Sequence, residues 1–82
     1  MNEQDIIELV RQSLFSIAPE FEEEEIEAEV AFRDQFDVDS MDFLNFIIVL
    51  HEVTGIDIPE ADYPNLETLR GCVSYIQEKT LA

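Results

Sequence analysis

The sequence is poor in basic residues: it has four Lys and Arg against 20 Asp and Glu among 82 residues, with a formal net charge of −16. Nucleic acid binding needs a cationic surface that neutralises phosphates, and four basic side chains cannot provide one. Binding to anionic membrane surfaces is disfavoured for the same reason. So strong a negative charge favours association with basic protein surfaces, and we expect partners of that kind.

Cysteine and long apolar segments are also scarce. Cys72 is the single cysteine, so no internal disulfide can form, which suits a reducing cytosol. The longest apolar run, Phe46 to Leu50, has five residues, whereas roughly 20 are needed to cross a bilayer. The N-terminus lacks the basic segment and apolar run of a secretory signal. These absences predict a cytoplasmic protein without membrane insertion.

Most metal-binding and phosphate-binding motifs are missing as well. One His and one Cys cannot form a zinc site. The two glycines, Gly55 and Gly71, cannot form a Gly-rich phosphate loop. A calcium-binding EF-hand loop that began at Asp37 would need Gly at its sixth position and Glu at its twelfth, where Asp42 and Ile48 stand. We therefore expect no metal site.

A catalytic serine–histidine pair is excluded by spacing. Ser40 and the single histidine, His51, fall on one predicted helix, about 16 Å apart along its axis. A general base must lie within about 3 Å of the proton that it takes. His51 therefore cannot activate Ser40, and we expect that the protein is not an enzyme.

The residues that are present predict an all-α fold. A hydrophobic fraction of 46% is typical of a globular chain, and the length predicts one domain over residues 1–82. Apolar residues at helical spacing predict helices over residues 3–16, 40–53 and 68–79. A single helical turn is expected over residues 60–63, with Pro64 ending it. Cys72 falls on the apolar face of the last helix, so we expect it in the core.

The ends of these helices carry recognisable signals. Asn2, Asp39 and Thr68 are suitable N-cap residues, and Asp42 stands three residues after Asp39. Gly55 is placed to end the helix that Asp39 begins. Gly71 lies inside the last helix and is expected to weaken it by roughly 1 kcal/mol relative to Ala.

Residues 18–39 keep no helical period for long. Seven glutamates fall between positions 20 and 29, a pattern typical of a solvated surface. Apolar residues nevertheless recur along the segment, and they are Phe21, Ile26, Val30, Phe32 and Phe36. We expect an ordered crossover that these side chains pin across the helices.

The helix predicted over residues 40–53 has two apolar faces. One face carries Phe43, Phe46, Ile47 and Leu50, and the other, beside Ser40, carries Met41, Leu44 and Ile48. A domain of this size has a thin core, which readily buries one such face. The second either packs under the long loop or stays exposed for a partner. We favour the second alternative, with Met41, Leu44 and Ile48 as partner-docking residues.

The string Phe36-Asp37-Val38-Asp39-Ser40-Met41-Asp42 resembles the phosphopantetheine attachment site of acyl carrier proteins, whose core is Asp-Ser-Leu or Asp-Ser-Met. Similar residues also occur at Phe32-Arg33, at positions 55–59, and at Thr68-Leu69 and Tyr75-Ile76, so the resemblance extends over nearly the whole chain. It implies a four-helix bundle with a long first loop and a short third helix.

The resemblance also implies a cofactor. Ser40 is then the residue that receives 4′-phosphopantetheine from coenzyme A, and the thiol of that arm carries acyl groups as thioesters. A phosphopantetheinyl transferase that uses magnesium performs the attachment, and Asp39 matches the residue that lies close to its metal. The N-terminus of a helix favours an anion such as the resulting phosphodiester.

One departure from the family pattern concerns charge. Carriers of fatty acid synthesis usually have several acids along the helix after the serine, whereas residues 41–53 contain only Asp42 and Glu52, with Asn45 and His51 where acids are common. We expect a freestanding monomeric carrier of bacterial type that serves acyl-transferring or acyl-modifying enzymes with basic surfaces. A carrier dedicated to a polyketide, an unusual lipid or an aminoacyl group is an open alternative, and so is an unmodified acidic helical adaptor.

Overall fold

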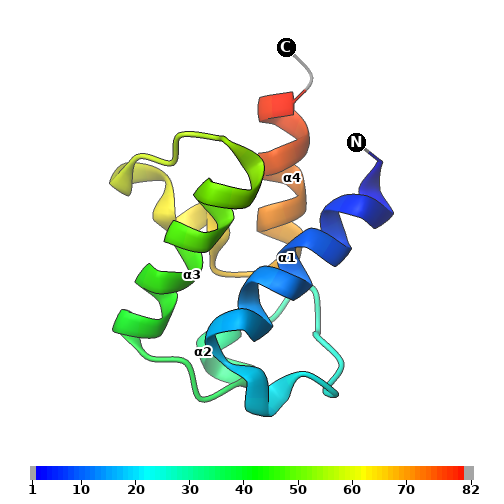
Figure 1. Cartoon of the computed structure of the whole chain (residues 1–82), viewed down its shortest axis with the longest axis vertical. Coiled ribbons are helices and arrows are strands. Elements are labelled where there is room, and N and C mark those ends of the chain that lie inside the picture. Colours follow the sequence, from blue (N-terminus) through cyan, green and yellow to red (C-terminus); the bar gives the residue numbers. More distant parts are fainter. Residues whose placement is uncertain (1, 81–82) are drawn as a thin grey trace.

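The structure is a computed structural model that describes residues 2–80, and all regular elements within this range are helical. The three long helices are α1 (Glu3–Ile17), α3 (Ser40–Thr54) and α4 (Leu69–Thr80). The short elements are η1 (Pro19–Phe21), α2 (Phe32–Gln35) and η2 (Glu60–Leu66). Helix α1 packs against both α3 and α4, with α2 and the long loop at one end of the bundle (Figure 1). The expected all-α bundle with a long first loop and a short third helix is confirmed.

The predicted capping residues define the helix ends. The Asp5 amide donates to Asn2 Oδ1 over 2.8 Å at the start of α1. At the start of α3 the Asp42 amide donates to Asp39 Oδ1 over 2.9 Å, and the Asp39 amide donates to Asp42 Oδ2 over 3.4 Å. Gly55 ends α3 with a φ of 72°, a left-handed conformation that glycine adopts without strain. Helices α1 and α3 begin at the predicted residues, and each ends one residue later than predicted.

The prediction that Pro64 ends the helical turn is wrong, because η2 continues through Pro64 to Leu66. The φ angle that proline imposes is compatible with a 3₁₀-helix, so the ring does not force the chain out of η2. Leu66 is completely buried. Burial of the Leu66 side chain offsets the loss of the backbone hydrogen bond that Pro64 cannot donate.

The core lies between the three long helices. Its completely or almost completely buried members include Ile6, Val10 and Leu14 of α1, Phe46, Ile47 and Leu50 of α3, and Leu69, Cys72 and Ile76 of α4. Cys72 is thus the core residue that the sequence predicted. Desolvation by burial raises the pKa of its thiol well above the ordinary value.

The segment between α1 and α3 is an ordered crossover, as expected. Phe32 and Phe36 are buried, and Phe21 and Ile26 pack against the core from partly exposed positions. Val30, the fifth expected anchor, is only partly buried and is not among the residues packed against the core. The short elements η1 and α2 within this segment were not predicted. The segment is also tied to α4, because the Arg70 amide donates to the Ala28 carbonyl over 2.9 Å.

Gly71 has a structural role that helix propensity does not reveal. A Cβ atom at this position would lie 2.1 Å from the carbonyl oxygen of Asn65. Only a residue without a side chain lets η2 approach the first turn of α4 so closely. The Gly71 amide also donates to Thr68 Oγ1 over 3.0 Å, which confirms Thr68 as the cap of α4.

Candidate functional site

Ser40 is the first residue of α3, and its side chain is exposed. The neighbouring Asp39 carboxylate caps the helix, so the Ser40 hydroxyl is not needed for the cap. Within residues 2–80 the Ser40 hydroxyl makes no hydrogen bond, whereas Asp39 and Asp42 form two hydrogen bonds with each other. An exposed and unengaged hydroxyl at a helix N-terminus fits the attachment of a phosphate-linked group.

A cavity of about 270 Å³ borders Ser40. Its apolar walls are Phe32, Val38 and Phe43, and its polar lining is completed by Arg33, Asp39 and Glu67. The cavity therefore lies where α2, the start of α3 and the segment before α4 meet. The ring centroid of Phe46 lies 5.4 Å from that of Phe32 and 6.2 Å from that of Phe43, so the cavity walls continue into the core.

The two apolar faces of α3 have different environments. Phe46, Ile47 and Leu50 are buried and Phe43 is half-buried, whereas Met41, Leu44 and Ile48 are 64%, 39% and 47% exposed. The second face therefore does not pack under the long loop, and that alternative is excluded. Exposed apolar side chains next to Ser40 are available to a partner protein that reaches for this serine.

Val53 is a further exposed apolar residue, which sequence reasoning did not single out. It lies in the last turn of α3, on a different side from Ile48, and borders a shallow groove with Leu9 of α1. Its position far along the helix from Ser40 separates it from the docking face. The helical projection of α3 places Val53 beside Phe46, at the edge of the buried face, so the sequence gives no signal of its exposure.

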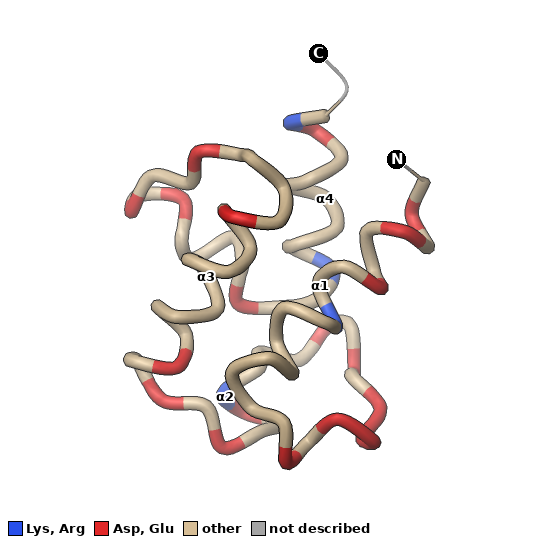
Figure 2. Tube along the Cα trace, in the orientation of Figure 1, with Lys and Arg blue, Asp and Glu red and all other residues tan. Residues whose placement is uncertain are grey.

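Acidic residues surround the start of α3. Figure 2 shows them along the segment that leads into this helix, along the long loop and around η2. Arg33 is the one basic residue among those that line the cavity beside Ser40, and its Nη2 lies 3.0 Å from Glu67 Oε1. Arg70 pairs with Glu29 elsewhere, at the junction of the loop and α4.

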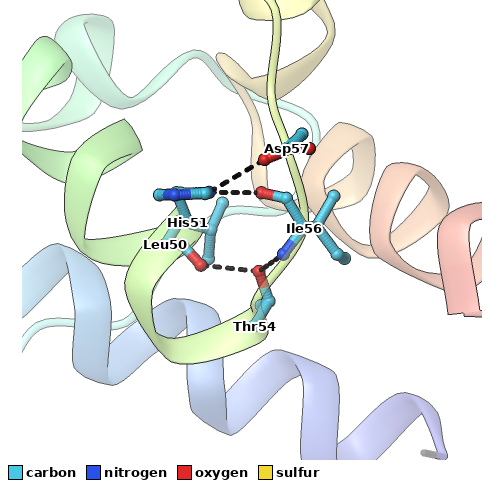
Figure 3. Close-up of polar contacts among 5 residues, drawn as sticks. All are labelled: Leu50, His51, Thr54, Ile56 and Asp57. Atoms are coloured by element: carbon cyan, nitrogen blue, oxygen red, sulfur yellow. Dashed lines mark hydrogen bonds and ion pairs between the residues drawn. The ribbon is translucent and has the colours of Figure 1, made fainter.

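His51 has a structural role at the far end of α3 (Figure 3). Its Nδ1 donates to the Ile56 carbonyl over 2.7 Å and lies 4.0 Å from Asp57 Oδ1. Thr54 Oγ1 donates to the Leu50 carbonyl and accepts from the Ile56 amide. These bonds hold the chain after Gly55 against the end of α3. The single imidazole of the sequence is therefore engaged at the end of the helix that lies far from Ser40.

Two absences concern the described part of the chain. Residues 2–80 contain no group of three His, Cys, Asp or Glu side chains arranged to hold a metal ion. Within the same residues no helix has the length and apolar character needed to span a bilayer.

Comparisons with known proteins point to one family. The family model "Phosphopantetheine attachment site" matches residues 5–76. An acyl carrier protein of Rubrobacter xylanophilus is 31% identical over 61 residues, which are 74% of this chain and 75% of that protein. An acyl carrier protein of Thermosynechococcus vestitus is 28% identical over 85 positions that include the whole of both chains. One of Renibacterium salmoninarum is 34% identical over 53 residues, 65% of each.

The family match covers most of the chain, and the region that it covers includes the exposed serine, its capping aspartate and the adjacent cavity. Proteins with this domain carry a covalently attached 4′-phosphopantetheine and act as carriers rather than enzymes. The helical bundle, the free serine at the start of α3 and the relatives together show that this chain belongs to the acyl carrier protein family.

Proposed function

We propose that this protein carries acyl intermediates as thioesters on a 4′-phosphopantetheine arm attached to Ser40, and that residues 1–82 form a single acyl carrier domain. The position of Ser40 carries the proposal: its side chain is exposed, the neighbouring Asp39 caps the helix in its place, and a cavity with apolar walls lies beside it. The other serines are less suitable. Ser13 is buried, Ser16 donates its hydroxyl to the Ser13 carbonyl, and Ser74 lies within α4.

The attachment chemistry requires a separate enzyme. Ser40 Oγ attacks the phosphorus of coenzyme A that bears the pantetheine, the pyrophosphate bond breaks, and 3′,5′-ADP leaves. The hydroxyl proton passes to a base of the phosphopantetheinyl transferase, because His51 is engaged at the other end of α3. Asp39, adjacent to Ser40, is proposed to lie close to the magnesium ion of that transferase.

The apolar residues beside Ser40 are proposed to receive the partner enzymes. Met41, Leu44 and Ile48 project from α3 next to the attachment point, so a protein that engages the arm contacts them. We propose cytoplasmic partners of fatty acid, lipid or polyketide biosynthesis with basic surfaces, which the net charge of −16 attracts to a monomeric carrier. The cavity walls of Phe32, Val38 and Phe43 favour a cargo with an apolar part.

The test is an intact mass measurement after incubation with coenzyme A, magnesium and a phosphopantetheinyl transferase. The wild-type chain and Ser74→Ala, which alters another exposed serine, should each gain one phosphopantetheine. Ser40→Ala should gain none and should unfold at nearly the wild-type temperature, because Asp39 provides the cap. Modification that persists in Ser40→Ala would show that another residue carries the arm. A wild-type chain that gains no mass would favour the unmodified adaptor.

A further inference from the structure

An ion pair lies at the opening of the cavity that borders Ser40. The side chains of Arg33 and Glu67 both line this cavity and are 69% and 33% exposed, whereas Phe32 at its floor is buried. Their charged ends meet at 3.0 Å. The cavity that borders Ser40 therefore combines apolar walls with an exposed ion pair.

The backbone holds this pair in place. The Phe32 amide, at the start of α2, donates to the Glu67 carbonyl over 2.8 Å. Arg33 follows Phe32 directly, so a main-chain hydrogen bond fixes the neighbour of Arg33 to Glu67, and the ion pair joins the two charged side chains. The backbone of Arg33 is therefore fixed at the cavity, while its exposed side chain keeps freedom to reorient.

Apart from the first turn of α3, the surroundings of Ser40 provide little for an anion. Asp34, Asp37, Asp39 and Asp42 all lie within six residues of it, and the Asp42 amide at the start of α3 is already bonded to the Asp39 carboxylate. A phosphodiester on Ser40 adds one more negative charge to this group, and like charges at short range repel one another. Arg33 is the one cation that faces the same cavity.

Arg33 can serve Glu67 and a phosphate together. A guanidinium has five N–H donors in a planar fork, and the contact with Glu67 is made through Nη2. The remaining donors suit the oxygens of a phosphate, to which arginine binds in a bidentate manner. Exposed ion pairs contribute little free energy, so Arg33 can also turn away from Glu67 at small cost.

We propose that Arg33 is a positioning residue that binds the phosphodiester of the arm on Ser40 and holds the base of the arm over the cavity, with Glu67 orienting the guanidinium. The proposal rests on the proposed attachment at Ser40. It predicts that attachment of the arm changes the environment of the Arg33 side chain and leaves that of Arg70 unchanged. Arg70 is the matched control because it is similarly exposed and forms a single ion pair, with Glu29.

The experiment compares the ¹⁵N-labelled chain before and after loading by coenzyme A and a transferase, with mass spectrometry to confirm the loading. In the wild type, the Arg33 Nε–H signal should shift on loading, and the Arg70 signal should stay in place. The ³¹P signal of the loaded chain should move in Arg33→Gln and remain at the wild-type position in Arg70→Gln. Arg33→Lys, which keeps the charge without the fork, should give an intermediate ³¹P position. High salt should move the wild-type signal toward that of Arg33→Gln.

An Arg33 signal that is the same in the unloaded and loaded wild-type chain would overturn the proposal, and this comparison needs no variant. Equal ³¹P positions in the wild type and Arg33→Gln would overturn it too. In both cases the loaded mass would leave the proposed function intact. A chain that takes up no arm would refute the proposed function, and this inference with it.

Discussion

Truncating the two apolar faces of α3 separately distinguishes residues that hold the fold together from residues that meet partners. Phe46 and Leu50 are completely buried, and Phe46 packs edge-on against Phe32. Removing such side chains loses both burial and packing, because the core cannot collapse fully around the space left behind. Phe46→Ala should lower the free energy of unfolding by roughly 3–5 kcal/mol, and Leu50→Ala by roughly 2–5 kcal/mol.

The exposed face should respond differently. Leu44 and Ile48 are 39% and 47% exposed, so only about half of each side chain leaves water on folding. Half of the roughly 1.5–3 kcal/mol that complete burial contributes is about 1 kcal/mol, and no enclosed cavity adds to the loss. Leu44→Ala and Ile48→Ala should therefore remain folded while they slow loading or acyl transfer, as loss of a central interface residue does.

The assay combines urea unfolding with the kinetics of the transferase well below the melting temperature of each variant. If Phe46→Ala does not fold, Leu50→Val removes less and keeps the core measurement possible. Val53→Ala is the matched control, since Val53 is as exposed as Ile48 but lies on another side of α3, far from Ser40. Leu44→Ala and Ile48→Ala variants as unstable as Phe46→Ala would show that both faces belong to the core. If Val53→Ala slowed loading as much as Leu44→Ala and Ile48→Ala do, partners would not dock specifically on Met41, Leu44 and Ile48.

Three further predictions concern charge, a close backbone approach and a tyrosine hydroxyl. The protein has 20 acidic residues and only four Lys and Arg, so its charges should repel one another. The melting temperature should therefore rise between low and moderate salt, and it should rise further with magnesium or calcium at equal ionic strength. A melting temperature that does not change with salt would contradict self-repulsion. Gly71→Ala should lower the melting temperature although alanine favours helices, because its Cβ would meet the Asn65 carbonyl; a gain in stability would refute the close approach. Desolvation by burial and a 2.8 Å hydrogen bond to Asp62 raise the pKa of Tyr75 to about 12, so stability that is complete below the ordinary pKa near 10 should fall as the pH rises from 10 to 12. Tyr75→Phe should lose that part of the fall, and an ultraviolet titration in which Tyr75 ionises near 10 would contradict it.

Several features of this protein follow from short stretches of sequence. Asn2 and Asp39 begin helices, and Gly55 ends one, because each acts on backbone groups within about one turn of its own position. Helical spacing of apolar residues likewise predicted the three long helices, and it placed Cys72 on the buried side of α4. The place of Ser40 at the start of α3 is a consequence of the adjacent cap, and it too could be predicted locally.

Short elements and close contacts between distant segments could not be predicted in this way. Helix α2 has four residues, too few to be stable alone, and it forms because Phe32 is buried and its amide reaches the Glu67 carbonyl. Pro64 was a misleading signal, since a buried Leu66 extends η2 beyond it. In each case the decisive partner lies in another element of the fold.

The tertiary structure also decided the character of the site. The sequence shows that α3 has two apolar faces, but only the packing of α1 against one side determines that Met41, Leu44 and Ile48 stay in water. The pairing of Arg33 with Glu67 beside Ser40 joins residues far apart in the chain. Periodicity and capping act over a few residues, whereas burial and ion pairing depend on which segments meet in space, and only the folded structure determines that.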